Sequence, residues 1–321
     1  MFHKPKIFIS KCIEFEHCRW NAAIINSPVV AKLKKHVECI TACPEKEIGL
    51  GIPRKSIRLV KKGRSHCLMQ NETGKDITDE MKHYTEKKIA LFKNMDGFIL
   101  KDRSPSCGVK GIKVYPDIGK VIALPEKGEG FFGGAIAEKF SYLPIENEGR
   151  LTNFSIREYF YTCIYTTASF RNINKKKSMK ALVDFHSKNK FLFMSYNQTV
   201  MRHMGKVVAN HESLSLAEVY ARYEMLLYKM FMKQPRYTSN INVLMHGLGY
   251  FSKDLNAKEK SYFLNTLEKY RSGKVPLSVC NSILLSWIER FDNSYLREQT
   301  FFMPYPEELL EVTDSGKGRK G

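Results

Sequence analysis

Three cysteines in this chain each follow a short apolar segment, near the point where a buried strand would end. They are Cys12 after residues 7–9, Cys43 after residues 37–42, and Cys107 after residues 97–100 and a polar loop. Open α/β sheets keep their ligand sites at the carboxyl ends of their strands. We therefore expect the three thiols to belong to one site.

The intervals between these cysteines exclude two common kinds of site. Zinc ribbons and thioredoxin motifs both need short Cys-x-x-Cys steps. A 4Fe-4S cluster accepts thiolates at any spacing that the fold can bring together, and three of them would leave one iron open, as in catalytic metal sites. Three buried, unligated cysteines are the alternative, because free cysteine is often buried. The spacing alone leaves both interpretations open.

Charged residues lie near these cysteines in the sequence. Lys101 and Arg103 precede Cys107 and are expected to favour its thiolate form. Arg54 follows a glycine-rich turn, where its planar guanidinium suits phosphate recognition or a structural ion pair.

The cysteines stand in motifs that resemble the TudS-type thiouracil desulfidase family over about the first half of the chain. The motifs are Ser10-Lys11-Cys12, Cys43-Pro44-Glu45 with residues 48–54, and Ser104-Pro105-Ser106-Cys107-Gly108. The resemblance implies a 4Fe-4S cluster on Cys12, Cys43 and Cys107 with one open iron. It also implies that Glu45 and Ser104 form an acid/base pair.

The segment after Cys12 departs from the family pattern, in which small residues and a glycine turn follow. Ala22 and Ala23 stand where that glycine is expected. Cys18 lies in the same segment, and we expect it to contact the ligands from outside the ligand triangle or to be a packing residue, since the family motif supplies only three ligands.

The second half resembles the YbgA-type helical domain. The matching stretches are residues 184–190, 242–251 and 270–277. The fused arrangement resembles the tRNA 4-thiouridine desulfidases, which implies removal of sulfur from 4-thiouridine in tRNA to leave uridine and sulfide.

The charge of the chain favours a polyanionic partner. Its 321 residues have a formal net charge of +19, with 29 Lys+Arg against 19 Asp+Glu in residues 1–172 and 23 against 14 in residues 173–321. Because both halves are basic, a nucleic acid lying across both is the expected partner. The candidate contacts are Arg54, Lys101 and Arg103 near the cysteines, and Lys175, Lys176, Arg202, Lys206 and Arg236 in the second half.

The hydrophobic pattern predicts two domains and a tail. Residues 1–172 read as an α/β domain, a mostly parallel sheet with flanking helices; its strands are expected at 5–9, 37–42, 57–60, 97–100, 112–115 and 121–124. Residues 173–313 read as an all-α domain, with helices expected at 176–195, 198–210, 214–232, 238–252, 256–272, 276–291 and 294–301. Residues 172–177 are expected to be the boundary, and residues 314–321 a disordered tail.

Two further features are expected to have mainly structural roles. The run Gly128–Gly134 matches G-x-G-x-x-G but lacks the context of a dinucleotide fold, so we expect a turn and a helix start with at most a minor phosphate contact. Tyr237 and Tyr250 could stack or hydrogen-bond beside the basic residues of the second half, but packing in the helical core is the expected role of Tyr250.

The absence of a long apolar run or a signal peptide predicts a cytoplasmic protein with reduced cysteines and no membrane association. Two other functions stay open. One is a desulfidase of free thiouracil or thionucleosides, and the other is a non-enzymatic iron–sulfur sensor that binds RNA.

Overall fold

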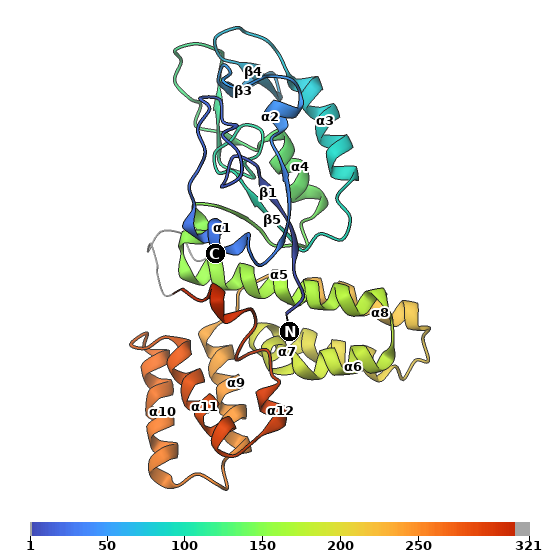
Figure 1. The fold of residues 1–321 in the computed structure, drawn as a ribbon, viewed down its shortest axis with the longest axis vertical. Helices are drawn as coiled ribbons and strands as arrows, with labels where there is room; N and C mark the ends of the chain where they lie inside the picture. Colours follow the sequence, from blue (N-terminus) through green and yellow to red (C-terminus); the bar gives the residue numbers. More distant parts are fainter. Residues whose placement is uncertain (1, 312–321) are drawn as a thin grey trace. The chain divides into compact units, whose positions relative to one another are not determined.

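The computed structural model describes residues 2–311, which form two compact units (Figure 1). One unit contains the chain up to Ala168 and from Glu308 onward, and the other is Ser169–Glu307. The division falls inside the long helix α5 (Phe154–Lys175), so the polar segment expected as a linker is helical up to Lys175. The predicted tail, residues 314–321, lies outside the described residues.

The first unit is built on a four-stranded parallel sheet in the order β2-β1-β5-β8. Its strands are β1 (Lys6–Ser10), β2 (Glu38–Ala42), β5 (Gly97–Leu100) and β8 (Ile145–Asn147). The side chains of Ile7–Ile9 and of Phe98 and Ile99 are fully buried, as expected of a central parallel strand pair. Ser10 is in register with Ala42, so the carboxyl ends of β1 and β2 open onto the same edge.

A second, mixed sheet has the order β4-β3-β6-β7. It contains β3 (Ile57–Lys62), β4 (Ser65–Gln70), β6 (Ile112–Tyr115) and β7 (Lys127–Gly128). Leu59 and Leu68 pack with Val114 in a buried cluster of this sheet. The α/β prediction is confirmed, but β4, β7, β8 and the antiparallel pairs were not expected. Residues 121–124 form no strand, and β7 pairs with β6 instead.

Helices cover the sheets. They are α1 (Pro28–Leu33), α2 (Pro44–Glu47), α3 (Thr78–Ala90) and α4 (Phe131–Lys139), followed by a 3-10 turn at Arg150–Thr152. α3 and α4 pack side by side (Figure 1). Phe132 at the start of α4 meets Phe8 of β1 with ring centroids 5.4 Å apart, and Phe140 after its end meets Phe98 of β5 at 5.0 Å. These ring contacts fix α4 on the parallel sheet.

The second unit is helical. After the end of α5 it contains α6 (Met179–Lys188), α7 (Lys190–Ala209), α8 (Leu216–Met230), α9 (Tyr237–Tyr250), α10 (Ala257–Arg271), α11 (Leu277–Arg290) and α12 (Ser294–Arg297). A 3-10 turn, Glu307–Leu309, follows. Capping boxes start α8 at Ser215 and α10 at Asn256, where each side chain binds a backbone amide that the helix leaves unpaired. The predicted helix 176–195 is divided at Asn189, and α7 is kinked at Asn197, whose backbone is extended (φ −158°, ψ 99°).

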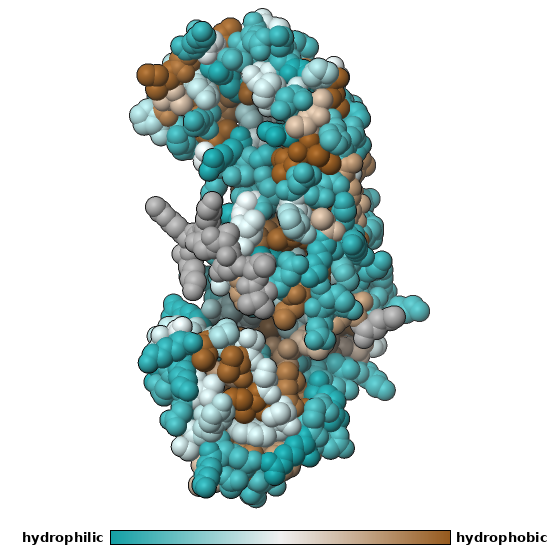
Figure 2. All heavy atoms as spheres, turned by 60° about the vertical axis from the view of Figure 1, so that its left-hand side comes forward, coloured by the Kyte–Doolittle hydropathy of each residue, from teal (hydrophilic) through white to brown (hydrophobic). Residues whose placement is uncertain are grey.

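The surface is dominated by hydrophilic residues on the face that Figure 2 shows, where hydrophobic side chains form small separate groups. Within residues 2–311, no helix combines the length and the apolar character that crossing a bilayer requires.

Candidate functional site

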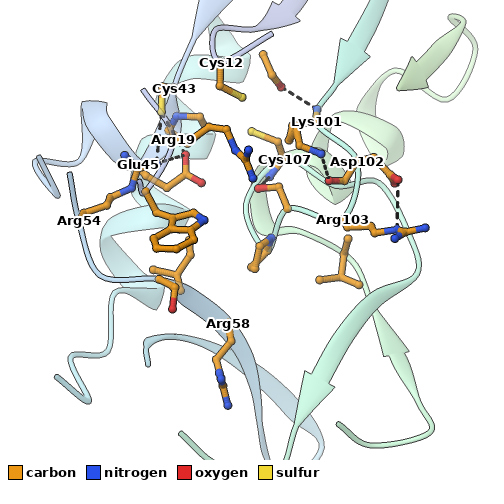
Figure 3. Close-up of a pocket in the computed structure, with 18 of the residues that line it drawn as sticks. Cys12, Arg19, Cys43, Glu45, Arg54, Arg58, Lys101, Asp102, Arg103 and Cys107 are labelled. Carbon is orange, nitrogen blue, oxygen red and sulfur yellow. Dashed lines mark hydrogen bonds and ion pairs between the residues drawn. The ribbon is translucent and has the colours of Figure 1, made fainter. Parts of the chain in front are cut away.

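A cavity of about 640 Å³ lies in the first unit, beside the carboxyl ends of β1, β2 and β5 (Figure 3). Cys12, Cys43 and Cys107 all line it, which is the juxtaposition that the strand-end pattern predicted. All eight cysteines of the chain are free thiols. The site therefore offers three unpaired sulfurs from three strand ends.

Cys43 is held where β2 passes into α2, and its side chain is buried. Its Sγ lies 3.4 Å from Oε2 of Glu45, 3.6 Å from the carbonyl oxygen of Cys18 and 3.8 Å from Nη2 of Arg54. Hydrogen bonding with the Cys18 thiol and burial both raise the pKa of Cys43, and the Glu45 carboxylate raises it further. A metal ion or cluster bound here would have to displace the proton of the Cys43 thiol.

Cys107 is held by a loop that the glycine run positions. The amides of Phe132 and Gly133, at the start of α4, both donate to the carbonyl oxygen of Ser106 at 2.9 Å, and the Gly130 amide donates to that of Gly108 at 2.8 Å. A Cβ added at Gly133 would lie 2.1 Å from the carbonyl oxygen of Cys107, so only glycine permits this approach. The expected phosphate contact is wrong, because these amides of the helix N-terminus bind the Cys107 loop.

A chain of hydrogen bonds connects Glu45 with two serines. The Ser106 hydroxyl donates to Oε1 of Glu45 at 2.6 Å, and it lies 2.9 Å from the Ser104 hydroxyl. Ser104 also accepts from the Cys107 amide at 3.1 Å. Ser106 is fully buried, and its hydroxyl is 3.6 Å from the Cys107 sulfur. Glu45 and Ser104, the acid/base pair that the resemblance implies, are connected through Ser106, to which the motif assigned no role.

Arg54 returns to the pocket because two left-handed glycines, Gly49 (φ +86°) and Gly51 (φ +73°), turn the preceding segment. Its guanidinium lies 3.7 Å from Oε2 of Glu45 and donates to the carbonyl oxygen of Cys18 at 2.9 Å. The Arg54 side chain is only 5 % exposed. Arg54 therefore holds Glu45 and Cys18 in place. Of the two expected roles, phosphate recognition and a structural ion pair, these contacts match the ion pair.

Lys101 and Arg103 line the cavity, but neither stabilises the thiolate of Cys107 as expected. Lys101 Nζ pairs with Glu148 at 2.6 Å, while Arg103 pairs with Asp102 at 3.4 Å and its side chain is 88 % exposed. The pKa of Cys107 is raised by burial and then by Glu45, so the expected stabilisation of its thiolate is wrong. The positive charges that lie near Cys107 in the sequence are neutralised or turned to solvent.

Cys18 lies directly beside two of the three predicted ligands. It lines the cavity, is completely buried, and its thiol contacts those of Cys12 and Cys43. The hydrogen bond with Cys12 and burial raise its pKa to about 12. Ala22, in the same segment, adopts a left-handed conformation (φ +57°), so the chain makes the expected turn without the expected glycine.

Arg19 and Trp20 also line the cavity, and nothing in the sequence pointed to them beyond their place after Cys12. Arg19 is half-buried, points into the pocket (Figure 3) and forms no ion pair with any residue that the structure describes. Trp20 is 50 % exposed. The pocket therefore has an uncommitted cation and a large aromatic surface near its sulfurs.

The sulfurs fit a cluster better than a single ion. No group of three or more His, Cys, Asp or Glu in residues 2–311 is placed to hold one metal ion. In a 4Fe-4S cluster each thiolate binds a different iron, so its ligands surround the cube and do not meet at one point. Four free thiols line the cavity, and Cys12, Cys43 and Cys107 among them can supply that donor set, with Arg54 nearby to offset negative charge.

The proposed nucleic-acid contacts of the second half lie in the helical unit. Lys175, Lys176, Arg202, Lys206 and Arg236 are all exposed, and none of them pairs with a carboxylate among the described residues. Their ammonium and guanidinium groups are thus available to an anionic partner.

Comparisons with known proteins match the two parts of the chain separately. The chain is 27% identical over 137 residues to the uncharacterized protein YbgA of Escherichia coli (strain K12), which covers 42% of this chain and 80% of that protein. It is 29% identical over 109 residues to the uncharacterized protein YbbK of Bacillus subtilis (strain 168), which covers 32% of this chain and 72% of that protein.

Among solved structures, the 4Fe-4S-dependent thiouracil desulfidase TudS aligns with 46% of this chain and 93% of its own, with 25% identity and a TM-score of 0.38. Residues 190–306 match DUF1722, a family of unknown function. Residues 7–148, which carry the three cysteines and Glu45, match the 2-thiouracil desulfurase family.

Proposed function

We propose that this chain is an iron–sulfur-dependent desulfidase that removes sulfur from 4-thiouridine in tRNA and leaves uridine. The observation that carries the proposal is the cavity in which Cys12, Cys43 and Cys107 meet beside the hydrogen-bonded chain Glu45–Ser106–Ser104. The match of residues 7–148 to the 2-thiouracil desulfurase family supports the reaction class.

The three cysteines would hold a 4Fe-4S cluster with one iron free of protein ligands. When bound, such a cluster supplies a soft Lewis acid that suits a thiocarbonyl sulfur.

Glu45 is the group placed to move protons. Its Oε1 accepts from Ser106 and its Oε2 faces Arg54, so the carboxylate is held in one orientation beside the sulfurs. A carboxylate so fixed can take a proton from water and return one to the product. Ser106 orients Glu45, and Ser104 extends the hydrogen-bonded chain by one more hydroxyl.

The cavity also suits the ring of the substrate. Its volume of about 640 Å³ lies within the usual range of ligand pockets. Trp20 offers a surface on which a pyrimidine can stack, and Arg19 offers a guanidinium that can bind an exocyclic oxygen or a neighbouring phosphate.

The choice of tRNA rests on charge. Both halves of the chain are basic, and Lys175, Lys176, Arg202, Lys206 and Arg236 present exposed cations on the helical unit. An RNA backbone would be bound by such groups with release of counterions. The reactive base would have to leave its stack to reach the cysteine pocket, as in other base-modifying enzymes.

Anaerobic reconstitution with iron and sulfide, followed by incubation with thiolated tRNA or with free 2-thiouracil, tests the proposal. Nucleoside analysis should show 4-thiouridine replaced by uridine in tRNA, with release of sulfide. Turnover of free thiouracil alone would make the chain a small-molecule desulfidase. Tight tRNA binding without any sulfide release would favour the iron–sulfur sensor.

A further inference from the structure

A second cavity, of about 490 Å³, lies in the helical unit, and the desulfidase site makes no use of it. Its walls come from α6, α7, α9 and α12, and they include His186, Lys190, Tyr250 and Tyr295. Two of the stretches that resemble the YbgA-type domain, residues 184–190 and 242–251, meet here although they lie far apart in the sequence. We call this cavity the helical groove.

Aromatic rings form one wall of the helical groove. Tyr250 and Tyr295 stack with centroids 5.7 Å apart and planes 21° apart. Both rings meet the buried Phe191 edge-on, at 6.2 Å and 6.4 Å, so the pair has a fixed support. Tyr250 is nevertheless 48 % exposed, so the expectation that it packs in the core is wrong. A supported aromatic ring that stays open to solvent can stack a planar ligand.

Polar groups stand beside these rings. Nδ1 of His186 is 3.1 Å from the hydroxyl of the buried Tyr223, which fixes the imidazole. Burial lowers the pKa of His186 to about 4, with Lys190 contributing, so the ring is a neutral hydrogen-bonding group at pH 7. Lys190 is exposed and pairs with no carboxylate in the described part of the chain.

The charge of the helical groove favours an anion. Of the described residues that line it, none is acidic, and Lys190 gives it an uncompensated positive charge. A planar ring, hydrogen-bonding atoms and one negative charge are together the features of a ribonucleotide. A free phosphate would not use the tyrosines, and an apolar peptide would not use Lys190.

We propose that the helical groove binds one unpaired nucleotide of an RNA, with the base against Tyr250 and the phosphate near Lys190. The inference rests on the proposed function, which gives the chain an RNA substrate. It adds a second contact point for that RNA, one that takes no part in the chemistry.

Binding of fluorescent hexauridylate to the full chain tests the proposal, with Tyr250→Ala and Lys190→Gln as variants. Loss of one stacked base should weaken affinity by about five- to a hundredfold in Tyr250→Ala. Lys190→Gln should weaken affinity and reduce its dependence on salt. Tyr262→Ala and Lys258→Gln are the matched controls, because both side chains are exposed on α10 and lie outside the helical groove.

Ultraviolet crosslinking of the same oligonucleotide should attach uridine to peptides that contain Tyr250 or Tyr295. Equal affinities in wild type and both variants, or crosslinks confined to other peptides, would overturn the proposal. Uridine monophosphate that binds as tightly as hexauridylate would also overturn it, because the ligand would then be a free nucleotide.

These results can be separated from the desulfidase reaction. Turnover of free 4-thiouridine, which needs only the cysteine pocket, should be unchanged in Tyr250→Ala and Lys190→Gln. If wild type desulfurates tRNA but the helical groove variants bind it normally, only the inference fails. If wild type releases no sulfide from any substrate yet the variants lose hexauridylate binding, only the proposed function fails.

Discussion

The arrangement around Glu45 indicates which side chains are placed to transfer protons in the proposed reaction. The carboxylate is nearly buried, and it is held by Ser106 on one oxygen and by Arg54 on the other. Ser104 is one hydrogen bond further away. The geometry therefore gives Ser106 the more direct role in proton transfer, whereas the motif alone pointed to Ser104.

Replacing Glu45 should separate chemistry from cluster binding. Glu45→Gln should keep the cluster absorption but lose turnover by about a hundredfold or more, because the amide cannot accept the proton. Ser106→Ala should cost more activity than Ser104→Ala, since only Ser106 donates directly to Glu45. Sulfide release under anaerobic conditions measures both effects, with the exposed Glu72→Gln as control. Full activity in Glu45→Gln would remove this residue from the mechanism.

The sequence located the three cysteines and Glu45 because motif and strand ends coincide there. It could not show that Lys101 is neutralised by Glu148, which lies 47 positions away in the chain. It also gave no reason to choose Ser106 over Ser104, or to place Cys18 against Cys12 and Cys43. Those facts depend on contacts between distant segments, which a local pattern does not encode.

Among the secondary-structure elements, most helices and the strands β1, β2 and β5 of the parallel sheet were predictable from hydrophobic periodicity, whereas the three-residue strand β8 was not. The missed strand β4 is an edge strand that begins with Ser65 and His66, so its burial is confined to its end. The residue pattern predicted one helix at 176–195 and did not indicate its division at Asn189. There the side chain bonds the carbonyl oxygen of Phe185 at 2.8 Å and ends α6.

The contact between α4 and the Cys107 loop predicts a strict requirement for glycine. Gly133→Ala would place a Cβ against the Cys107 carbonyl, so the loop must move. We expect loss of iron binding and a free energy of unfolding lower by roughly 1–3 kcal/mol. Chemical denaturation and iron analysis measure these effects. Gly249→Ala, in α9 with nothing within 4 Å of the added Cβ, should bind iron normally. Iron binding that survives in Gly133→Ala would show that the loop tolerates displacement.

Because His186 is largely buried, we expect the free energy of unfolding of the helical unit to depend on pH. Its folded pKa is about 4, against an ordinary value of 6.5, because burial disfavours the charged ring. Between these values the unfolded chain binds the proton and the folded chain does not, so stability falls as the pH is lowered through this window. The shift of about 2.5 corresponds to a loss of about 3 kcal/mol when the window is crossed completely.

Urea denaturation at several pH values between 7 and 4 measures this loss. His186→Gln should flatten the pH dependence, whereas the exposed His203→Gln should leave it unchanged. The same slope in wild type and His186→Gln would contradict the assignment.

For the chain as a whole, the positive charge predicts that tRNA and small substrates respond differently to surface changes. Reversing Lys176, Arg202 and Lys206 to Glu should weaken tRNA turnover and its salt dependence, because fewer counterions are released. Turnover of free thiouracil should stay the same. Reversing Lys253, Lys258 and Lys274, which are also exposed, changes the net charge equally and is the control. Equal losses in both triple variants would mean that net charge, not a defined surface, attracts the RNA.

The most direct test of the central claim is the iron and sulfide content of the reconstituted protein, measured together with sulfide release from 4-thiouridine. We predict about four irons and four sulfides per chain in wild type, and in Cys18→Ala as well, since three thiolates suffice. Cys12→Ala, Cys43→Ala and Cys107→Ala should each lose the visible absorption of the cluster and the activity. A Cys107→Ala protein that keeps cluster and turnover would contradict the account. So would a Cys18→Ala protein that loses both as completely as Cys107→Ala.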